Sequence, residues 1–374
     1  MSGVLLDQLP GVLERLQGSP LQVYPWQCSR RRHRLSGCTL CIDHCPAQAL
    51  SWDGSLRIDL DRCTGCGVCA TLCPNGVFEV RDPTNEELLS QVAKTAQAGK
   101  SVYFACPVYL QGVGERKGAE GLVVVDCLGR LDESILVGAV AAGATTVWLI
   151  DGSCQGCTGA EGHTVARKVV RSANLLLEGF GTPEAILMRG ELPSRPEAAY
   201  RPEQANGEPS RRAFFGRVAA ETTRAAAVVI DAALDGAAAE ATEIGPPRRG
   251  ELPVRLPVKR RLLLAALKRL GEPISGAVEV GEGPFAQFRI KESCTGCQMC
   301  AFFCPTGALR KVVLEGQAGV AFRLAYCTNC RLCQEICYWD AVYLSPLIQR
   351  AKLVDETEDT LLVPRAAAPT VRLP

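Results

Sequence analysis

The spacing of the cysteines constrains this chain more than any other feature. The run C-x-x-C-x-x-C-x-x-x-C-P occurs at 63–74 (CTGCGVCATLCP) and again at 294–305 (CTGCQMCAFFCP). The run at 327–337 (CTNCRLCQEIC) keeps the spacing without the proline, and the run at 28–46 (CSRRRHRLSGCTLCIDHCP) keeps it after a first gap of nine residues. These four runs contain sixteen of the twenty cysteines. Segments this short bury too little apolar surface to fold around a core alone, so ligand–metal bonds must replace much of that core.

Composition and charge narrow the class of protein. The chain has 374 residues, enough for two or three domains, and its 41 Lys and Arg nearly balance 40 Asp and Glu, so no overall field favours nucleic acid or an anionic membrane. The most apolar window, 136–150, is shorter than the roughly 20 apolar residues that span a bilayer, and residues 1–18 lack the features of a secretory signal. We therefore expect a soluble cytoplasmic protein, without direct membrane insertion, whose cysteines bind metal rather than form disulfides.

The cysteine runs resemble those of the bacterial two-cluster ferredoxins. In that pattern the thiolates of the C-x-x-C-x-x-C loop converge on one cluster, and the fourth cysteine begins a short helix and binds the other cluster of the pair. The resemblance implies four [4Fe–4S] clusters. In the first pair the ligands are Cys28, Cys38, Cys41 and Cys73, then Cys63, Cys66, Cys69 and Cys45. In the second pair they are Cys294, Cys297, Cys300 and Cys337, then Cys327, Cys330, Cys333 and Cys304.

Departures from the pattern leave alternatives open. Nine residues separate Cys28 from Cys38, so either Cys28 is the fourth ligand or that cluster contains three irons or takes another ligand. Tyr338 follows Cys337 where the pattern has proline, a smaller departure that leaves ligation by Cys337 expected. Zinc also accepts four thiolates, but a triple run with a distant fourth cysteine favours iron–sulfur clusters.

Between the cysteine runs the sequence predicts an α/β domain. Apolar, β-branched runs alternate with helical patterns, which is typical of an open parallel sheet; the runs are 101–105, 121–126, 145–150 and 184–189, and the helical patterns are 84–98, 131–142 and 161–178. The remaining cysteines, Cys106, Cys127, Cys154 and Cys157, all follow predicted strands. Because the carboxyl ends of parallel strands meet at one edge, we expect these thiols to gather in one crevice, with the glycine-rich turn at 151–162 offering backbone N–H groups to them.

This segment resembles the delta subunit of the methyl-viologen-reducing hydrogenases. The resemblance rests on CLGRLDESILVGAVAAGATTVWLIDGSCQGC (127–157) and ARKVVRSANLLLEGFG (166–181). It implies a [2Fe–2S] cluster held by Cys106, Cys127, Cys154 and Cys157. It also implies electron transfer between a hydrogenase or formate dehydrogenase and a heterodisulfide-reductase-type flavoprotein. The last two cysteines lie closer together than in that family and Cys106 has no companion nearby, so zinc or unliganded thiols remain alternatives.

The expected fold is an α+β multidomain chain, in which two ferredoxin-like 2[4Fe–4S] modules flank a central α/β domain with an open parallel sheet. We place the N-terminal module at 1–83, the central domain at 84–190 and the C-terminal module at 272–348. Pro-rich linkers and helices occupy 191–271, and 349–374 is expected to be an extended tail.

The function predicted is that of an electron-transfer subunit of a cytoplasmic redox complex in anaerobic metabolism. Its expected partners are protein subunits (a flavoprotein, a hydrogenase or a molybdenum- or tungsten-containing oxidoreductase) in a hetero-oligomer, and not nucleic acid. No catalytic residue is predicted. One alternative is a redox enzyme with a reactive thiol or an open cluster site in the central domain. The other is an interaction scaffold in which metals only hold small domains together.

Two further groups are weighed from the sequence. The basic run at 30–34 is interpreted as a solvated loop, with partner docking as the alternative. His44, in CIDHCP, is interpreted as an exposed loop residue that could tune a cluster by hydrogen bonding.

Overall fold

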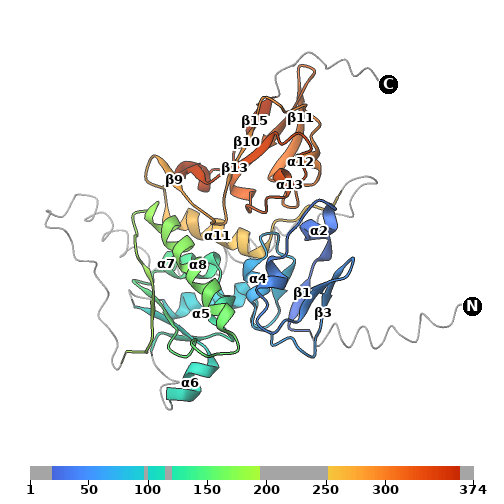
Figure 1. The fold of residues 1–374 in the computed structure, drawn as a ribbon. Coiled ribbons are helices and arrows are strands. Elements are labelled where there is room, and N and C mark those ends of the chain that lie inside the picture. Colours follow the sequence, from blue (N-terminus) through green and yellow to red (C-terminus); the bar gives the residue numbers. More distant parts are fainter. Residues whose placement is uncertain (1–18, 97–99, 114–119, 194–251, 363–374) are drawn as a thin grey trace, which may run out of the picture.

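Three packed parts make up the described chain. The computed structural model describes residues 19–96, 100–113, 120–193 and 252–362. An N-terminal module (blue), a central domain (cyan to green) and a C-terminal module (orange to red) lie against one another (Figure 1). The sequence predictions for residues 1–18, for the proline-rich linkers and alanine-rich helix between 194 and 251, and for the tail after 362 fall outside the described residues.

The N-terminal module contains two small antiparallel sheets. Strand β1 (Leu21–Val23) pairs with β4 (Phe78–Val80), and β2 (Leu50–Trp52) forms a hairpin with β3 (Leu56–Ile58). Gly54 allows the hairpin turn because its φ is +65°, a backbone conformation that residues with a side chain rarely adopt. The helical segments between the strands are short: η1 (Pro25–Gln27), α2 (Ser29–Arg32), α3 (Leu40–Asp43) and α4 (Val68–Leu72).

The C-terminal module repeats this plan. Strand β10 (Gln287–Ile290) pairs with β13 (Val342–Ser345), and β11 (Leu309–Leu314) forms a hairpin with β12 (Gln317–Phe322). The helical segments are α12 (Met299–Phe302), η5 (Leu324–Tyr326) and α13 (Leu332–Glu335). The internal repeat of the sequence is thus a structural repeat, with each strand–turn–strand connector folded as a hairpin.

Part of the segment expected as an extended tail is structured. Strand β14 (Leu347–Gln349) pairs with β9 (Ala277–Glu279), and η6 (Arg350–Leu353) buries Leu353 completely. Strand β15 (Asp359–Leu362) then joins the hairpin as a third strand beside β12. Charged pairs hold this end in place, because Glu358 accepts hydrogen bonds from both Arg310 and Arg323.

The central domain contains a parallel sheet with the strand order β6-β5-β7-β8. The strands are β5 (Val102–Ala105), β6 (Leu122–Val124), β7 (Val147–Ile150) and β8 (Ile186–Arg189), and each lies within a run predicted from the sequence. Alternate residues of β5 face opposite sides, with Val102 and Phe104 in the main core and Tyr103 and Ala105 in a second apolar cluster. The central parallel sheet is therefore as expected.

Helices cover the main core face of this sheet. They are α5 (Asn85–Thr95), α7 (Glu133–Ala141) and α8 (Ala160–Glu178), while α6 (Pro107–Val113) packs into the second cluster. Helix α5 begins at a capping box, in which Thr84 accepts from the Glu87 amide and Glu87 accepts from the Thr84 amide. Such caps contribute about 1 kcal/mol each.

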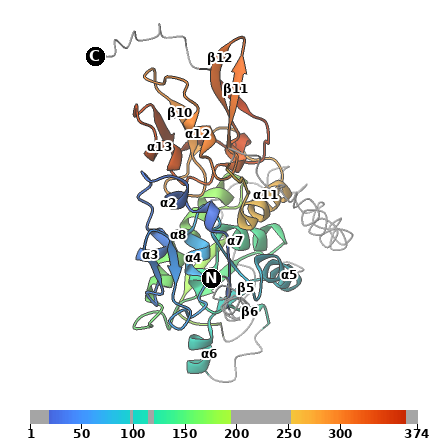
Figure 2. The ribbon, with the colours of Figure 1, turned by 90° about the vertical axis from the view of Figure 1, so that its right-hand side faces the viewer.

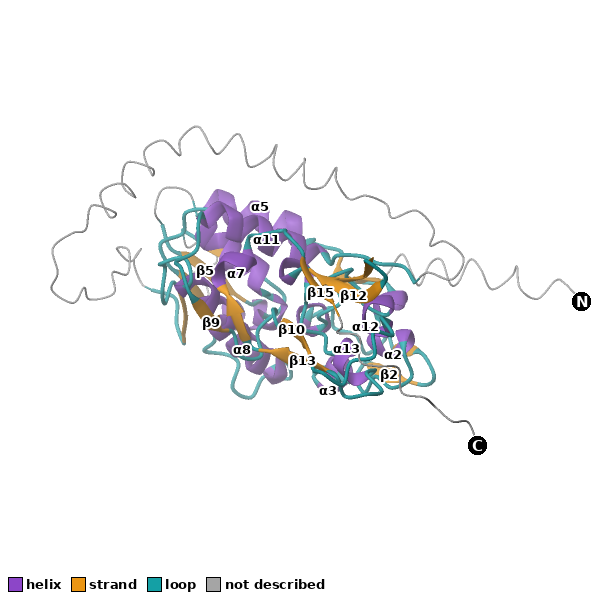
Figure 3. Ribbon diagram, turned by 90° about the horizontal axis from the view of Figure 1, so that it is seen from above, coloured by secondary structure: helices purple, strands orange, loops and turns teal. Residues whose placement is uncertain are grey.

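Helix α11 (Val258–Leu270) extends the same core. It packs against α7 and α5, and Leu262, Leu263 and Leu267 are buried (Figure 3). This helix falls within the linkers and helices predicted at 191–271, but its apolar face belongs to the main core. Before it, the stretch 252–257 runs between the two cysteine-rich modules.

Figure 2 shows the C-terminal module stacked on the other two parts. Among the described helices, none has the length and apolar character to cross a bilayer.

Candidate metal centres

The cysteines of the N-terminal module lie in two groups of four. Cys28, Cys38, Cys41 and Cys73, which we call the first N-terminal set, line one small cavity. The nine-residue gap after Cys28 is taken up by α2 and a turn, so the chain returns to Cys38 and Cys28 stays beside the other three. The structure thus places Cys28 where the ferredoxin resemblance needs a fourth ligand.

A second cavity collects the other four cysteines of this module. Cys45, Cys63, Cys66 and Cys69, the second N-terminal set, line it. Cys45 comes from the first run and Cys73 from the second, so each set takes its fourth member from the other run. This is the crossed arrangement that the resemblance implies. Gly65 and Gly67 turn the loop with φ of +68° and +76°.

The C-terminal module has the same crossed arrangement. Cys304, Cys327, Cys330 and Cys333, the second C-terminal set, line a cavity. The first C-terminal set is Cys294, Cys297, Cys300 and Cys337. Here burial, together with the neighbouring thiols of Cys297, Cys294 and Cys337, raises the pKa of the Cys300 thiol to about 12. All twenty cysteines are described, and of these Cys297 alone is exposed.

Backbone amides point at the fourth cysteine of several runs. Cys45 Sγ accepts from the Ala49 amide at 3.3 Å, and Cys73 Sγ accepts from the Val77 amide at 3.4 Å. Cys337 Sγ accepts from the Ala341 amide at 3.2 Å, so the same four-residue offset recurs in both modules. Hydrogen bonds donated to sulfur favour the thiolate, which is the form that binds iron.

The donor chemistry of each set suits an iron–sulfur cluster. Every set offers four thiols, and burial raises the pKa of Cys41 to about 12, so the free thiol would keep its proton at neutral pH unless metal displaced it. Within the described residues, no three His, Cys, Asp or Glu side chains are placed to bind one metal ion. In three of the sets the thiols instead surround a cavity.

The four remaining thiols gather at the carboxyl edge of the parallel sheet. Cys106 follows β5, Cys127 follows β6, and Cys154 and Cys157 lie in the loop after β7. Burial raises the pKa of Cys154 to about 12, and the thiols of Cys106, Cys127 and Cys157 contribute to the rise. We call these four the central set, and the structure brings them together as the strand pattern predicted.

Short-range contacts support the thiols of the central set. Cys127 Sγ accepts from the Gly129 amide at 3.4 Å, and Cys157 Sγ accepts from the Gly159 amide at 3.2 Å. Helix α8 begins so close to Cys127 that a Cβ on Gly162 would lie 2.5 Å from its sulfur. The glycine-rich turn therefore brings backbone, rather than side chains, against the sulfur atoms.

The central set lies next to the second N-terminal set. Burial raises the pKa of Cys127 to about 11, the Gly129 amide opposes this, and the nearby thiol of Cys66 adds to the rise. The turn after Cys127 is η3 (Leu128–Arg130), and the Arg130 carbonyl accepts from Thr71 Oγ1 of α4 at 2.9 Å. A Cβ on Gly67 would lie 2.7 Å from Arg130 Cγ, so this glycine allows the cysteine loop and the arginine to pack closely.

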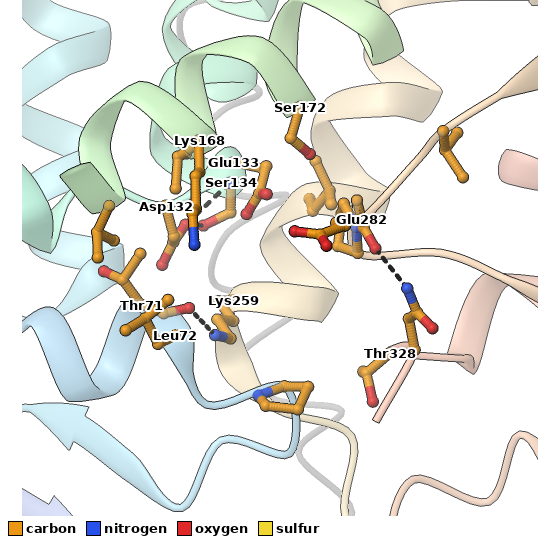
Figure 4. A pocket seen from close by; sticks show the side chains of 18 of the residues that line it. Thr71, Leu72, Asp132, Glu133, Ser134, Lys168, Ser172, Lys259, Glu282 and Thr328 are labelled. Atoms are coloured by element: carbon orange, nitrogen blue, oxygen red, sulfur yellow. Dashed lines mark hydrogen bonds between the residues drawn. The ribbon is translucent and has the colours of Figure 1, made fainter. Parts of the chain in front are cut away.

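A larger pocket lies where the three parts of the molecule meet (Figure 4). Lys259 of α11 crosses one side of it and donates to the carbonyls of Ala70 and Thr71 at 2.9 and 2.6 Å. The labelled lining residues are Thr71 and Leu72 from the N-terminal module, Asp132, Glu133, Ser134, Lys168 and Ser172 from the central domain, Lys259 from α11, and Glu282 and Thr328 from the C-terminal segment.

Two interpretations of polar residues need correction. His44 is partly buried, and its Nδ1 lies 2.6 Å from Glu161 Oε1 of α8, so it joins the N-terminal module to the central domain. In the basic run, Arg32 is buried and donates to carbonyls of the C-terminal module, while Arg30 lies over the Trp52 ring. The run is thus partly an internal interface and not only a solvated loop.

The fold and the sites together define a class. Two small modules, each with two four-cysteine sets in crossed pairs, describe an iron–sulfur protein of the two-cluster type. Residues 36–77 and 293–341 match the family described as the 4Fe-4S dicluster domain. The chain belongs to this family of iron–sulfur electron-transfer proteins.

Curated relatives match short parts of the chain. Pyruvate synthase subunit PorD of Thermotoga maritima is 34% identical over 71 residues, which cover 18% of this chain and 70% of PorD. A ferredoxin of Thermococcus litoralis is 43% identical over 53 residues, covering 14% of this chain and 85% of the ferredoxin. An uncharacterized protein of Methanothermobacter thermautotrophicus is 47% identical over 49 residues, 13% of this chain, and the match spans only 10% of that protein's length. No solved structure matches the chain.

Proposed function

We propose that this chain is an electron-transfer subunit of a multi-subunit oxidoreductase. The observation that carries the proposal is the crossed convergence of the predicted ligand sets. Cysteines from runs more than fifteen residues apart meet around shared cavities, as two-cluster ferredoxins require. The two N-terminal and two C-terminal sets would each hold a [4Fe–4S] cluster, and such clusters supply one-electron oxidation and reduction when bound.

The central set would hold a [2Fe–2S] cluster. Four thiols at one sheet edge are a sufficient donor set, and the amides of Gly129 and Gly159 already point at two of the sulfurs. The resemblance of 127–181 to a hydrogenase delta subunit is the basis for the cluster type. In this assignment the residues of the chain exclude water, donate to sulfur and hold the five sets in place.

The partners proposed are proteins. PorD is named as a subunit of pyruvate synthase. That relationship and the resemblance of the central domain support a hetero-oligomer in the cytoplasm with a flavoprotein, a hydrogenase or a molybdenum- or tungsten-containing subunit. Nucleic acid has no role in this proposal. The proposed domain limits are those given by the sequence, with α11 and β15 added to the folded parts.

Anaerobic purification of the full chain tests the proposal. Four cubanes and one two-iron cluster predict about 18 iron and about 18 sulfide per chain, with several reducible centres in an EPR titration. The isolated chain should show no substrate turnover, and material pulled from its native source should carry flavin-, nickel- or molybdenum-containing subunits. A colourless protein, or one that contains only zinc, would refute the proposal.

A further inference from the structure

The two cysteine-rich modules meet at a buried polar interface. Asn75 Nδ2 donates to Ser29 Oγ at 2.9 Å, and Thr328 Oγ1 donates to Asn75 Oδ1 at 3.4 Å. All three residues are at least 93% buried. Ser29 follows Cys28, Asn75 is two residues after Cys73, and Thr328 follows Cys327. This chain of hydrogen bonds therefore joins backbone that positions the first N-terminal set to backbone that positions the second C-terminal set.

Arg32 crosses the same interface. It is 7% exposed, and its Nε donates to the Phe303 carbonyl at 3.0 Å. Its Nη1 donates to the Pro253 carbonyl at 2.7 Å and its Nη2 to the Cys304 carbonyl at 3.4 Å. Its partners in the C-terminal half are thus uncharged carbonyls, one of which belongs to a cysteine of the second C-terminal set. The guanidinium lies near Cys304 and Cys330 of the second C-terminal set, while the Arg32 backbone amide donates to the Cys28 carbonyl at 2.9 Å.

Cysteines of the two modules face each other here. Burial raises the pKa of Cys330, and the thiols of Cys304, Cys327 and Cys38 raise it further. The charge of Glu335, two residues after Cys333, likewise raises the pKa of Cys38 in the N-terminal module, where burial is the largest cause. The first N-terminal set and the second C-terminal set are therefore neighbours across the interface.

Neighbouring sets are also in contact within each module. Cys69 and Cys73 belong to one apolar cluster, and Cys41 and Cys45 pack against it, which links the two N-terminal sets. Helices α12 and α13, which carry Cys300 and Cys333, pack against each other, which links the two C-terminal sets. Val68, in the second N-terminal run, lies against Gly129 and Gly162 beside Cys127, so the central set adjoins the second N-terminal set.

We propose that the chain holds its five cysteine sets in one unbranched series. The order is the central set, the second N-terminal set, the first N-terminal set, the second C-terminal set and the first C-terminal set. The inference rests on the proposed function and adds an order to it. One end of the series is the crevice of the α/β domain, and the other is at the surface, where Cys297 is exposed. Arg32 is the positioning residue at the join between the two modules.

EPR spectroscopy of the anaerobic full chain, reduced with titanium(III) citrate, tests the order. Neighbouring paramagnetic clusters broaden and split one another's signals. Loss of the first N-terminal set in C38A/C41A should remove the interaction between the modules and sharpen signals on both sides. The matched variant C297A/C300A, which removes the terminal set, should change only the signal of the second C-terminal set. An unchanged signal of the second C-terminal set in C38A/C41A, or N-terminal signals altered by C297A/C300A, would overturn the order.

Substitutions at Arg32 test the join while keeping every ligand. Arg32→Gln removes a positive charge beside the second C-terminal set, so it should lower the midpoint potential of that signal and leave that of the first C-terminal set unchanged. Arg32→Lys should restore the potential, and Arg31→Gln, at the exposed neighbouring position, should not shift it. Equal shifts in Arg31→Gln, or none in Arg32→Gln, would contradict the assignment. Iron is counted first, so absent clusters would refute the proposed function rather than the order.

Discussion

At the scale of single residues, the central set depends on the absence of a side chain. Gly162 lies in the first turn of α8, and an added Cβ would come within 2.5 Å of Cys127 Sγ, a distance that forces a shift. Gly159, three residues earlier, would place a Cβ at an ordinary 3.6 Å from Cys157 Sγ. The two positions therefore form a matched pair for testing the site.

We predict that Gly162→Ala displaces Cys127 and lowers the iron content by about two atoms, because one two-iron cluster is lost while the four cubanes remain. Gly159→Ala should keep the full iron content. The measurement is iron and sulfide per chain, together with the EPR signals of the cubanes. Full iron in both variants would show that Cys127 tolerates the move or is not a ligand.

The cysteine sets could be predicted from the sequence, but the residues that join the two modules could not. The resemblance to two-cluster ferredoxins predicted the crossed sets. The fourth cysteine of each run was expected to begin a short helix, but in the structure that helix ends before it, as α4 ends before Cys73. Arg32 carries no such signal, since it is one of four arginines among five consecutive residues and only the fold shows which one is buried. Asn75 and Thr328 are 253 residues apart, and no local pattern relates them.

At the scale of elements, β15 depends on one carboxylate. Hydrogen bonds from Arg310 hold the pKa of Glu358 below its usual value of 4.5, and Arg323 acts in the same direction. A carboxyl group with a lowered pKa contributes stability above its unfolded pKa and loses that contribution as the pH falls through the lowered value. The docking of β15 should therefore persist at neutral pH and weaken only in acid.

We predict that Glu358→Gln increases hydrogen exchange in 359–362 severalfold at pH 7, because the neutral side chain no longer forms ion pairs with Arg310 and Arg323. Iron content should stay unchanged, since the strand lies outside the cysteine sets. Glu356→Gln, which breaks only the exposed pair with Lys268, is the control and should leave exchange in β15 as in the wild type. Fast exchange in the control would mean that general charge loss, and not this pair, releases the strand.

Most elements of the central domain could be predicted, while the shortest ones could not. The β-branched runs predicted β5 to β8 and the helical patterns predicted α5, α7 and α8, because the apolar residues of these elements form most of the main core. Helix α2 has four residues within a basic run, and β15 follows a charged stretch. Neither therefore shows a periodic pattern of apolar residues from which it could be predicted. A helix was predicted at the positions of α11. The flanking prolines suggested that this helix belongs to a linker, but its leucines complete the main core.

At the scale of the whole molecule, stability is unevenly distributed. The apolar core of the N-terminal module is a small cluster around Leu21, Leu50 and Phe78, and cysteines make up part of it. The large core beneath α7, α8 and α11 instead continues into the C-terminal module, where Phe288 and Phe322 belong to it. Metal ligation must therefore matter far more to the N-terminal module than to the sheet.

We predict that removing the clusters with a chelator under anaerobic, reducing conditions unfolds the N-terminal module and leaves the parallel sheet folded. Amides of β1 and β4 should lose protection from hydrogen exchange, while those of β5 and β7 stay protected. Reconstitution with iron and sulfide should reverse the change. Simultaneous loss of protection in all strands would show that the molecule unfolds as one unit.

The stretch 252–257 restricts how this protein can bind other proteins. It is held on both sides, since the Arg255 amide donates to the Pro305 carbonyl at 3.0 Å and the Arg255 carbonyl accepts from Gln27 Nε2 at 2.7 Å. Swinging one module away on a hinge would require breaking both bonds and withdrawing Arg32 from its carbonyls. In the proposed series, a chain that keeps these contacts cannot reach toward its donor and acceptor in turn, so we expect those proteins to bind at opposite ends of it.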